Sequence, residues 1–280
     1  MNSNSFFILT TTDGSARRGQ VVTPHGSFQT PAFMPVGTSG AVKAMTADDL
    51  ESTGAEIILG NTYHLYLQPG TEIIKAQGGL AKFNGWNHPT LTDSGGFQIF
   101  SMNDLIEVTD DGAEFKSHHD GSLHKFTPEG VVETQRALGS DFMMVLDECT
   151  PFPCDEEYAR TSNDMTIRWA ERCKNQFERT QPQYGCGQAL FAIVQGSTFP
   201  SIREISAQKL VELNFEGYAI GGLSVGEPAE EMYKMTALCT SILPENKPRY
   251  LMGVGTPENI LESIERGIDM FDCVMPTRNG

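Results

Sequence analysis

The chain has 280 residues and a formal net charge of −16, with 39% hydrophobic and 20% charged residues. This length allows one large domain with its own core, and the composition is that of a globular protein rather than a disordered one. The acidic balance argues against binding of nucleic acid over the whole surface and leaves room only for a local basic patch.

Targeting and membrane segments are not expected. No apolar stretch approaches the roughly 20 residues that are needed to cross a bilayer. The first residues lack the charged and apolar segments of a signal peptide. We therefore expect a cytoplasmic protein with no membrane partner. Residues 1–280 are expected to form a single domain, for which the elements below predict a barrel.

The cysteines are predicted to be single reduced thiols rather than metal ligands. They are widely scattered and none forms a CxxC pair, so a zinc site would have to gather ligands from distant segments. The six residues are Cys149, Cys154, Cys173, Cys186, Cys239 and Cys273.

The predicted elements, in chain order, begin with three strand-like runs and continue as an alternation of short apolar runs and amphipathic stretches of helical length. The first three runs are Phe6–Thr11, Gly19–Thr23 and Gly26–Gln29. The eight later strand candidates are Ala32–Val36, Ala55–Gly60, Thr90–Asp93, Phe142–Asp147, Leu190–Gln195, Tyr218–Gly221, Tyr250–Gly253 and Met270–Val274. The seven helix candidates are Thr46–Ser52, Thr71–Phe83, Pro128–Leu138, Glu156–Arg179, Ser201–Leu213, Ala229–Leu243 and Pro257–Arg266.

Several of these helices carry boundary signals. Thr127 and Thr256 each precede a proline and a glutamate, which is the pattern of a capped helix start. Gly139, Gly217 and Gly267 stand where helices are expected to end.

Eight strands that alternate with helices predict an α/β fold of the (β/α)₈ TIM-barrel type. The N-terminal runs then form a hairpin that caps the barrel floor, and Phe100–Phe126 is a β-rich insertion after the third strand. The eighth barrel helix is not among the predicted elements. A doubly wound sheet is the rival fold, but Pro35–Gly40 does not supply the GxGxxG loop that it needs after its first strand.

Polar residues recur where the predicted strands end, which is the face of such barrels that carries function. Asn61, Asp93, Asp147 and Gln195 follow strands two to five, and Asp272 lies within strand eight. One aspartate after a strand is usually a cap or turn residue, but a set of them favours a site. Carboxylates without histidine ligands favour glycosyl chemistry.

The same set suits recognition of a flat heterocycle. Asp accepts hydrogen bonds from ring N–H groups, Gln binds a carbonyl oxygen, and paired glycines expose backbone amides, as at Gly221–Gly222. Phe97 and Met252 are placed to sandwich such a ring, or else belong to the core. A metal cluster of His118, His119 and His124 is less favoured than solvated or capping roles for these histidines.

Six segments resemble the tRNA-guanine transglycosylases in the order of that family, and the resemblance runs from about Phe6 to the end of the chain. They are Thr92–Gln98 (TDSGGFQ), Asp147–Pro151 (DECTP), Val194–Gly196 (VQG), Gly217–Leu223 (GYAIGGL), Tyr250–Gly255 (YLMGVG) and Phe271–Arg278 (FDCVMPTR).

The resemblance implies an enzyme that exchanges guanine at wobble position 34 of tRNAs with GUN anticodons for a 7-deazaguanine, in queuosine biosynthesis. Asp272 is then the nucleophile and Asp93 the general acid/base. Cys149 and Val225 resemble the bacterial type, which uses the precursor preQ1. The implied substrate-binding residues are Ser94, Gly95, Gly96, Phe97, Asp147, Gln195, Gly222, Leu223 and Met252. The implied RNA-binding residues are Gly253, Val254, Gly255, Thr256, Pro257, Glu258, Asn259, Thr277, Arg278, Asn279 and Gly280.

The resemblance also implies a structural Zn²⁺ held by three cysteines and one histidine, together with a last barrel helix, beyond Gly280. We therefore expect a C-terminally truncated chain with no metal ligands of its own, no organic cofactor and an incomplete grip on the tRNA anticodon loop. A homodimer is implied as well, with Lys43 and Asn61–Leu65 near the contact.

Two other functions stay open at this point. One is a non-catalytic partner subunit of a tRNA-modifying complex, which the missing lobe and the acidic surface favour. The other is a nucleoside or glycoside hydrolase on the same barrel, in which water replaces the incoming base.

Overall fold

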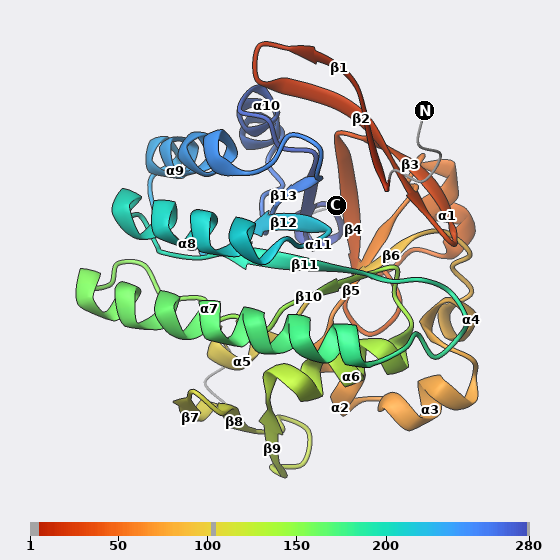
Figure 1. Cartoon of the computed structure of the whole chain (residues 1–280). Coiled ribbons are helices and arrows are strands. Elements are labelled where there is room, and N and C mark those ends of the chain that lie inside the picture. Colours follow the sequence, from red (N-terminus) through yellow and green to blue (C-terminus); the bar gives the residue numbers. More distant parts are fainter. Residues whose placement is uncertain (1–5, 102–104, 279–280) are drawn as a thin grey trace.

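The computed structural model describes residues 6–101 and 105–278. Its centre is a closed barrel of eight parallel strands in the order β10-β11-β12-β13-β14-β4-β5-β6, which confirms the predicted TIM-barrel fold (Figure 1). The barrel strands are β4 (Ala32–Gly37), β5 (Ile58–Gly60), β6 (Thr90–Thr92), β10 (Phe142–Met144), β11 (Ala189–Val194), β12 (Gly217–Ile220), β13 (Arg249–Leu251) and β14 (Met270–Cys273).

Helices surround this barrel, and α7, α8 and α9 lie side by side along one flank (Figure 1). None of the helices in the described ranges is long and apolar enough to cross a membrane. Their bounds are α1 (Ala47–Ser52), α2 (Thr62–Leu67), α3 (Thr71–Ala76), α4 (Leu80–Asn84), α5 (Gly96–Ser101), α6 (Pro128–Leu138), α7 (Glu156–Arg179), α8 (Pro200–Leu213), α9 (Ala229–Ile242), α10 (Pro257–Glu265) and α11 (Met275–Arg278).

The single helix predicted over Thr71–Phe83 is wrong, because the structure has two helices there. Gly78 and Gly79 separate α3 from α4 with φ angles of +86° and +98°. These values lie outside the helical region and are easily reached only by glycine. The apolar periodicity continues across the break and therefore hid it.

Other differences concern short elements and helix ends. The helices α2, α5 and α11 were not predicted, because four to six residues are too few for a periodic pattern. The residues that follow the last strand, Met275–Arg278, form the helix α11. Helix α8 ends at Asn214 in the left-handed conformation, so Gly217 is the first residue of β12 and not a helix stop.

The N-terminal runs form a three-stranded antiparallel sheet, one strand more than a hairpin. Its strands are β1 (Phe7–Asp13), β2 (Ala16–Thr23) and β3 (Gly26–Thr30). The rings of Phe6 and Phe28 lie 5.6 and 5.9 Å from that of Phe142, the first residue of β10. The sheet therefore closes the floor of the barrel, as predicted.

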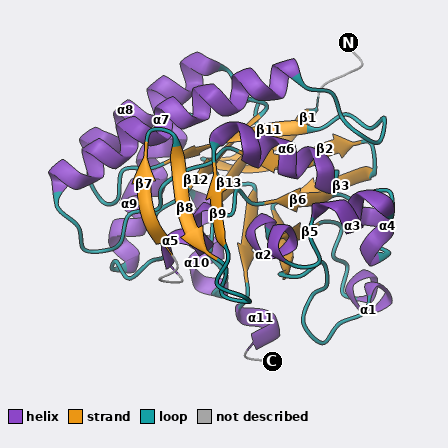
Figure 2. Ribbon diagram, turned by 90° about the horizontal axis from the view of Figure 1, so that it is seen from below, coloured by secondary structure: helices purple, strands orange, loops and turns teal. Residues whose placement is uncertain are grey.

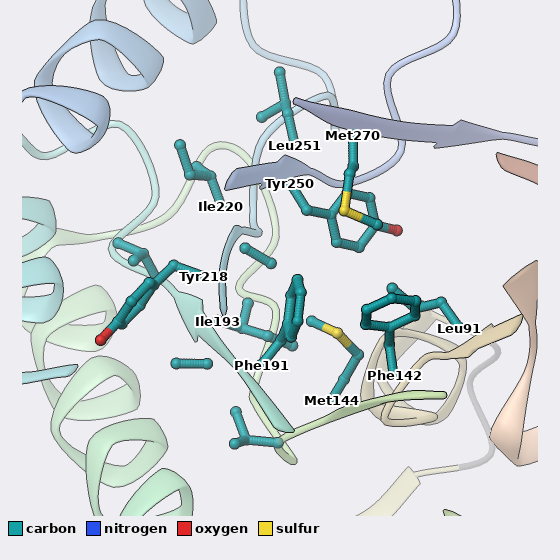
Figure 3. Packing of buried hydrophobic residues seen from close by; sticks show 14 of the residues in the cluster. Leu91, Phe142, Met144, Phe191, Ile193, Tyr218, Ile220, Tyr250, Leu251 and Met270 are labelled. Atoms are coloured by element: carbon teal, nitrogen blue, oxygen red, sulfur yellow. The ribbon is translucent and has the colours of Figure 1, made fainter. Parts of the chain in front are cut away.

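Large side chains fill the barrel interior near this floor. The rings of Phe142 and Phe191 pack edge to face with centroids 5.5 Å apart, and Met144 lies beside them (Figure 3). All three side chains are fully buried. The packed floor leaves the opposite end of the strands as the place for a site.

The insertion after β6 is a second antiparallel sheet, as predicted, with strands β7 (Leu105–Thr109), β8 (Gly112–Lys116) and β9 (Leu123–Phe126). It lies on the outside of the barrel along α7 (Figure 2). The indole N–H of Trp169 donates to the Asp110 carbonyl, and Arg168 Nε donates to Asp110 Oδ1, both at 2.9 Å. These contacts fix the turn between β7 and β8 against α7.

Candidate active site

The polar residues that follow the barrel strands come together at the carboxyl ends, as predicted. Asn61 after β5 donates to Asp93 after β6, with 2.5 Å between Nδ2 and Oδ2. Gln195 after β11 donates to Asp147, which follows β10, with 2.7 Å between Nε2 and Oδ2. Since these hydrogen bonds join neighbouring strand ends, the residues belong to one site.

Asp93 is a buried carboxylate held by neutral donors. Besides Asn61, the backbone N–H of Thr62 and the side-chain amide of Gln98 donate to it at 2.7 and 3.0 Å. Burial and, less strongly, the negative charge of Asp272 raise the pKa of Asp93 to about 6 against the effect of these donors. A carboxyl group with this pKa can both give and take a proton near neutrality.

Asp272 lies half-buried in β14 and is bonded on one oxygen only. The Tyr250 hydroxyl and the Gly253 backbone N–H donate to Oδ1 at 2.5 and 2.8 Å. Among the described residues no donor reaches Oδ2. Burial raises the pKa of Asp272, while the two donors lower it by stabilising the carboxylate. The pKa of Tyr250 lies well above its usual value, so this hydroxyl stays protonated as a donor.

Asp147 forms the centre of a second polar group. The Ser94 hydroxyl donates to Oδ1 at 2.9 Å, and the Gly96 N–H donates to the Ser94 oxygen at 3.1 Å. Gln195 holds the other carboxylate oxygen. Burial is the main cause that raises the pKa of Asp147 to about 6.

Gly222 passes close beside Gln195. Its φ angle is +63°, and a Cβ atom at this position would lie 2.2 Å from Gln195 Oε1. The oxygen Oε1 is buried and has no hydrogen-bond partner among the described residues. The backbone of Gly222, the amide of Gln195 and the carboxylate of Asp147 therefore border one another without an intervening side chain.

The two residues expected to sandwich a ring differ in exposure. Phe97, in α5, is 51% exposed, whereas Met252 is half-buried after β13. The Cys149 thiol lies within range of the Asp147 charge, and burial raises its pKa to about 12. A thiol with this pKa remains protonated and is not a nucleophile.

The expected RNA-binding stretch Gly253–Asn259 forms the loop after β13 and the start of α10. The Thr256 hydroxyl accepts from the Asn259 N–H and caps that helix, and Val254 is buried in the core with 1% exposure. Thr277 and the exposed Arg278 lie on α11. Asn279 and Gly280 lie outside the described residues.

Two residues that contact the acids were not assigned from the sequence. Gln98 stands in the Thr92–Gln98 segment, but without a structure it does not differ from any exposed helix residue. Tyr250 reads as an apolar strand residue, and only the register of β13 beside β14 turns its hydroxyl to Asp272. Three-dimensional contact, and no local pattern, identifies both.

The described residues contain no group of three or more His, Cys, Asp or Glu side chains that could hold a metal ion. His118 donates to or accepts from the Tyr63 hydroxyl at 3.0 Å, and His124 does so with Tyr66 at 3.2 Å. The histidines of the insertion therefore have structural partners. The described residues therefore do not supply the three cysteines and one histidine of the zinc site that the family resemblance implies.

Comparison with known proteins bears on the family of the chain. A family model described as Queuine tRNA-ribosyltransferase matches residues 12–280. The queuine tRNA-ribosyltransferase of Thermoanaerobacter pseudethanolicus is 57% identical over 264 residues, which are 94% of this chain and 69% of that protein. That of Lawsonia intracellularis is 56% identical over 279 residues, which are 100% of this chain and 74% of that protein. The chain therefore belongs to the queuine tRNA-ribosyltransferase family, the transglycosylase enzymes that its motifs predicted.

Proposed function

We propose that this protein exchanges guanine at the wobble position of tRNA for preQ1, through a covalent bond between ribose and Asp272. One observation carries the proposal. Two carboxylates at the carboxyl ends of the strands, the buried Asp93 and the half-buried Asp272, lie close enough for the charge of Asp272 to raise the pKa of Asp93. Both are held by neutral donors, so neither is neutralised by a fixed cation.

In the first displacement, Asp272 Oδ2 attacks C1′ of the ribose. The bond from C1′ to the guanine nitrogen breaks as the bond from Oδ2 to C1′ forms. Protonated Asp93 gives its proton to the departing base, which leaves as neutral guanine. The donors on Oδ1, from Tyr250 and Gly253, hold the carboxylate ionised and oriented for attack.

In the second displacement, the incoming base replaces Asp272. Asp93, now ionised, takes the proton from the attacking ring nitrogen, and that nitrogen forms the new bond to C1′ as Oδ2 leaves. Two inversions at one carbon retain its configuration, as in retaining glycosidases. Protons and charges balance, because Asp93 ends protonated and Asp272 ends ionised.

The base is proposed to bind at the group around Asp147. This carboxylate accepts from the ring N–H and the exocyclic amino group, and Gln195 with the Gly222 backbone binds the ring carbonyl. Phe97 and Met252 stack on the two faces of the ring. Cys149 and Val225, both half-buried, border the space for the aminomethyl group of preQ1.

The target nucleotide must leave the stack of the anticodon loop to reach this pocket. The loop from Gly253 to Asn259 and the exposed Arg278 lie at the same end of the barrel and are the proposed RNA contacts. A homodimer is proposed with Lys43 exposed at the contact. Within Asn61–Leu65 only His64 is partly exposed, so the other four residues would support that contact from within.

Base exchange is tested with the 280-residue chain, a tRNA with a GUN anticodon and radiolabelled guanine, with unlabelled preQ1 as competitor. We expect label to enter the tRNA and preQ1 to displace it. Asp272→Ala should incorporate none. Release of guanine without incorporation would instead identify a hydrolase, and native mass spectrometry that finds an obligate complex with an active relative would identify a partner subunit.

A further inference from the structure

Arg203 is a fully buried arginine next to the proposed base pocket. It lies in α8 with 0% exposure. Its guanidinium donates to three backbone carbonyl oxygens, at 2.7 Å to Ser197, 3.1 Å to Val194 and 3.2 Å to Gly222. Burial of a charge is unfavourable unless polar groups surround it. These three carbonyl dipoles therefore explain how the side chain is accommodated, but not why it stands at this position.

The three carbonyls belong to the two loops that supply base-binding groups. Val194, the last residue of β11, and Ser197 stand on either side of Gln195 and Gly196. Gly222 stands after β12. In addition, the N–H of Gln195 donates to the Ser206 hydroxyl at 3.2 Å, also from α8. Arg203 thus ties the loop that carries Gln195 to the loop that carries Gly222.

This tie also sets the orientation of the peptide unit between Gly222 and Leu223. A trans peptide is planar, so its C=O and N–H point in opposite directions. Because the Gly222 carbonyl points to Arg203, the Leu223 N–H points away from it. Without the guanidinium this peptide could rotate, since the φ angle of Gly222 is +63° and glycine accepts many conformations.

The guanidinium also lies within electrostatic range of the pocket. Its charge lowers the pKa of the Cys149 thiol, while the charge of Asp147 raises it. Arg203 and Asp147 therefore act on the same thiol from a short distance. A fixed cation near this pocket favours bound groups with partial negative charge, such as a ring carbonyl oxygen.

We propose that Arg203 is a positioning residue that sets the affinity for the base, by holding Gln195 and the Gly222–Leu223 peptide in their binding geometry. This inference rests on the function proposed above. It predicts a specific kinetic signature: removal of Arg203 raises KM for the base, and leaves KM for tRNA and the rate at saturating base nearly unchanged. A merely structural role would instead lower the fraction of active protein, and thus the apparent kcat, at unchanged KM.

The chain offers a matched control in Arg136, a second buried arginine with 2% exposure. It lies in α6 and donates to the carbonyls of Phe177 and Thr180 at 2.8 and 3.2 Å. Its partners lie at the floor end of the barrel and not in the strand-end loops. Arg136→Met therefore removes a comparable set of hydrogen bonds away from the pocket.

The experiment compares Arg203→Met, Arg203→Lys and Arg136→Met with the unchanged chain. Calorimetric titration with guanine and with preQ1 gives Kd, and exchange assays give KM for base and tRNA separately. We expect Arg203→Met to weaken base binding roughly tenfold or more, which corresponds to one strong hydrogen-bonded contact. Arg136→Met should stay within about twofold of the unchanged chain. The base affinity of Arg203→Lys should lie between those of Arg203→Met and Arg136→Met, because one ammonium group cannot hold three carbonyl oxygens.

Base affinity in Arg203→Lys equal to that of the unchanged chain would overturn the proposal, even if Arg203→Met does not fold. Equal losses in Arg203→Met and Arg136→Met would overturn it as well. Failure of the proposed function is distinct from both results. It is seen in the unchanged chain, as a lack of guanine and preQ1 binding, and not in a difference between variants.

Discussion

Asp269 and Asp272 are three residues apart and serve opposite ends of the barrel. Asp269 precedes β14 at the floor, is fully buried, and is bonded on both oxygens: Arg17 Nε donates to Oδ1 at 3.0 Å and the Arg249 N–H to Oδ2 at 2.8 Å. Asp272, near the other end of β14, is half-buried, and its donors among the described residues are neutral and reach Oδ1 alone. The partners of each carboxylate, and not its depth alone, separate a structural acid from a candidate nucleophile.

The pKa values make the same point. Burial raises the pKa of Asp269 to about 6 although the Arg17 cation lowers it, and burial raises that of Asp93 to about 6 against neutral donors. The same value thus arises at the floor and at the site. A perturbed pKa by itself would not have told the two ends apart. The charge of the partners does so, because Asp269 pairs with the Arg17 cation whereas the donors to Asp93 are neutral.

The comparison is tested most severely by Asp272→Asn. The amide cannot form the ribosyl bond, so we expect exchange to fall by about 10⁴-fold or more, with the fold intact. Incorporation of labelled guanine measures the loss, and urea unfolding measures stability. The exposed Asp13 supplies the control, since Asp13→Asn should retain full exchange. More than a tenth of the original rate in Asp272→Asn would rule out Asp272 as the nucleophile.

A substitution at the floor of the barrel should lower stability and leave base exchange unchanged. Arg17→Met leaves the Asp269 carboxylate buried without its cation, and we expect the free energy of unfolding at pH 7 to fall by about 3 kcal/mol. Exchange per folded molecule should not change. Because the folded pKa of Asp269 lies near 6, above the ordinary 3.8, protonation at lower pH relieves the unpaired charge. The destabilisation should therefore shrink below pH 6. Urea titrations at pH 7 and pH 5 measure it, and an equal loss at both would contradict this account.

Asp147→Asn should stabilise the fold while it weakens base binding. The folded pKa of Asp147 is about 6 against an ordinary value of 3.8, so its ionised form is disfavoured by folding. The ionised carboxylate therefore lowers the free energy of unfolding above pH 6, and this loss vanishes below about pH 4. A neutral amide avoids it, and we expect a gain of about 2 kcal/mol at pH 7. Unfolding at pH 7 and pH 4 tests the sign, and a variant less stable than the unchanged chain at pH 7 would refute it.

The smallest effect is expected from Tyr250→Phe. The Tyr250 hydroxyl lowers the pKa of Asp272, so its removal should raise that pKa and move the acidic limb of the pH–rate profile to higher pH. We expect kcat at pH 7 to fall roughly fivefold. Tyr218→Phe is the matched control, because the Tyr218 hydroxyl in β12 accepts only a backbone N–H, from Phe215, among its described contacts. An unshifted limb in Tyr250→Phe would separate this hydroxyl from catalysis.

The eight barrel strands could be predicted because each is a short apolar run between polar or glycine-containing segments, and the closed order follows from their alternation with helices. Long helices with a proline start, such as α6 and α10, were predicted to within one residue at each end. Breaks made by backbone conformation, as at Gly78–Gly79, do not interrupt the apolar pattern and were missed. Helices of one or two turns carry too little periodicity to detect.

For the site, the aspartates and Gln195 could be predicted from their recurrence at strand ends. Their supporting residues could not. Tyr250 looks like a core aromatic, and Arg203 in the segment SIREISAQKL looks like a surface charge of an ordinary helix. Tyr250 contacts Asp272 on the neighbouring strand, 22 residues away, and Arg203 contacts Gly222, 19 residues away, so the fold and not the local sequence identifies both contacts.

The pairing of β14 with β4 has a consequence for how the protein acquires activity. Met270 pairs with Ala32 and Asp272 with Met34, so the strand that completes the barrel is also the one that carries the proposed nucleophile. A growing chain on the ribosome therefore holds Asp93, Asp147 and Gln195 long before it holds Asp272. No folding intermediate that lacks this last pairing contains both acids at one site. Enzymatic turnover during refolding would thus report on closure of the barrel itself, later than any signal from helix formation.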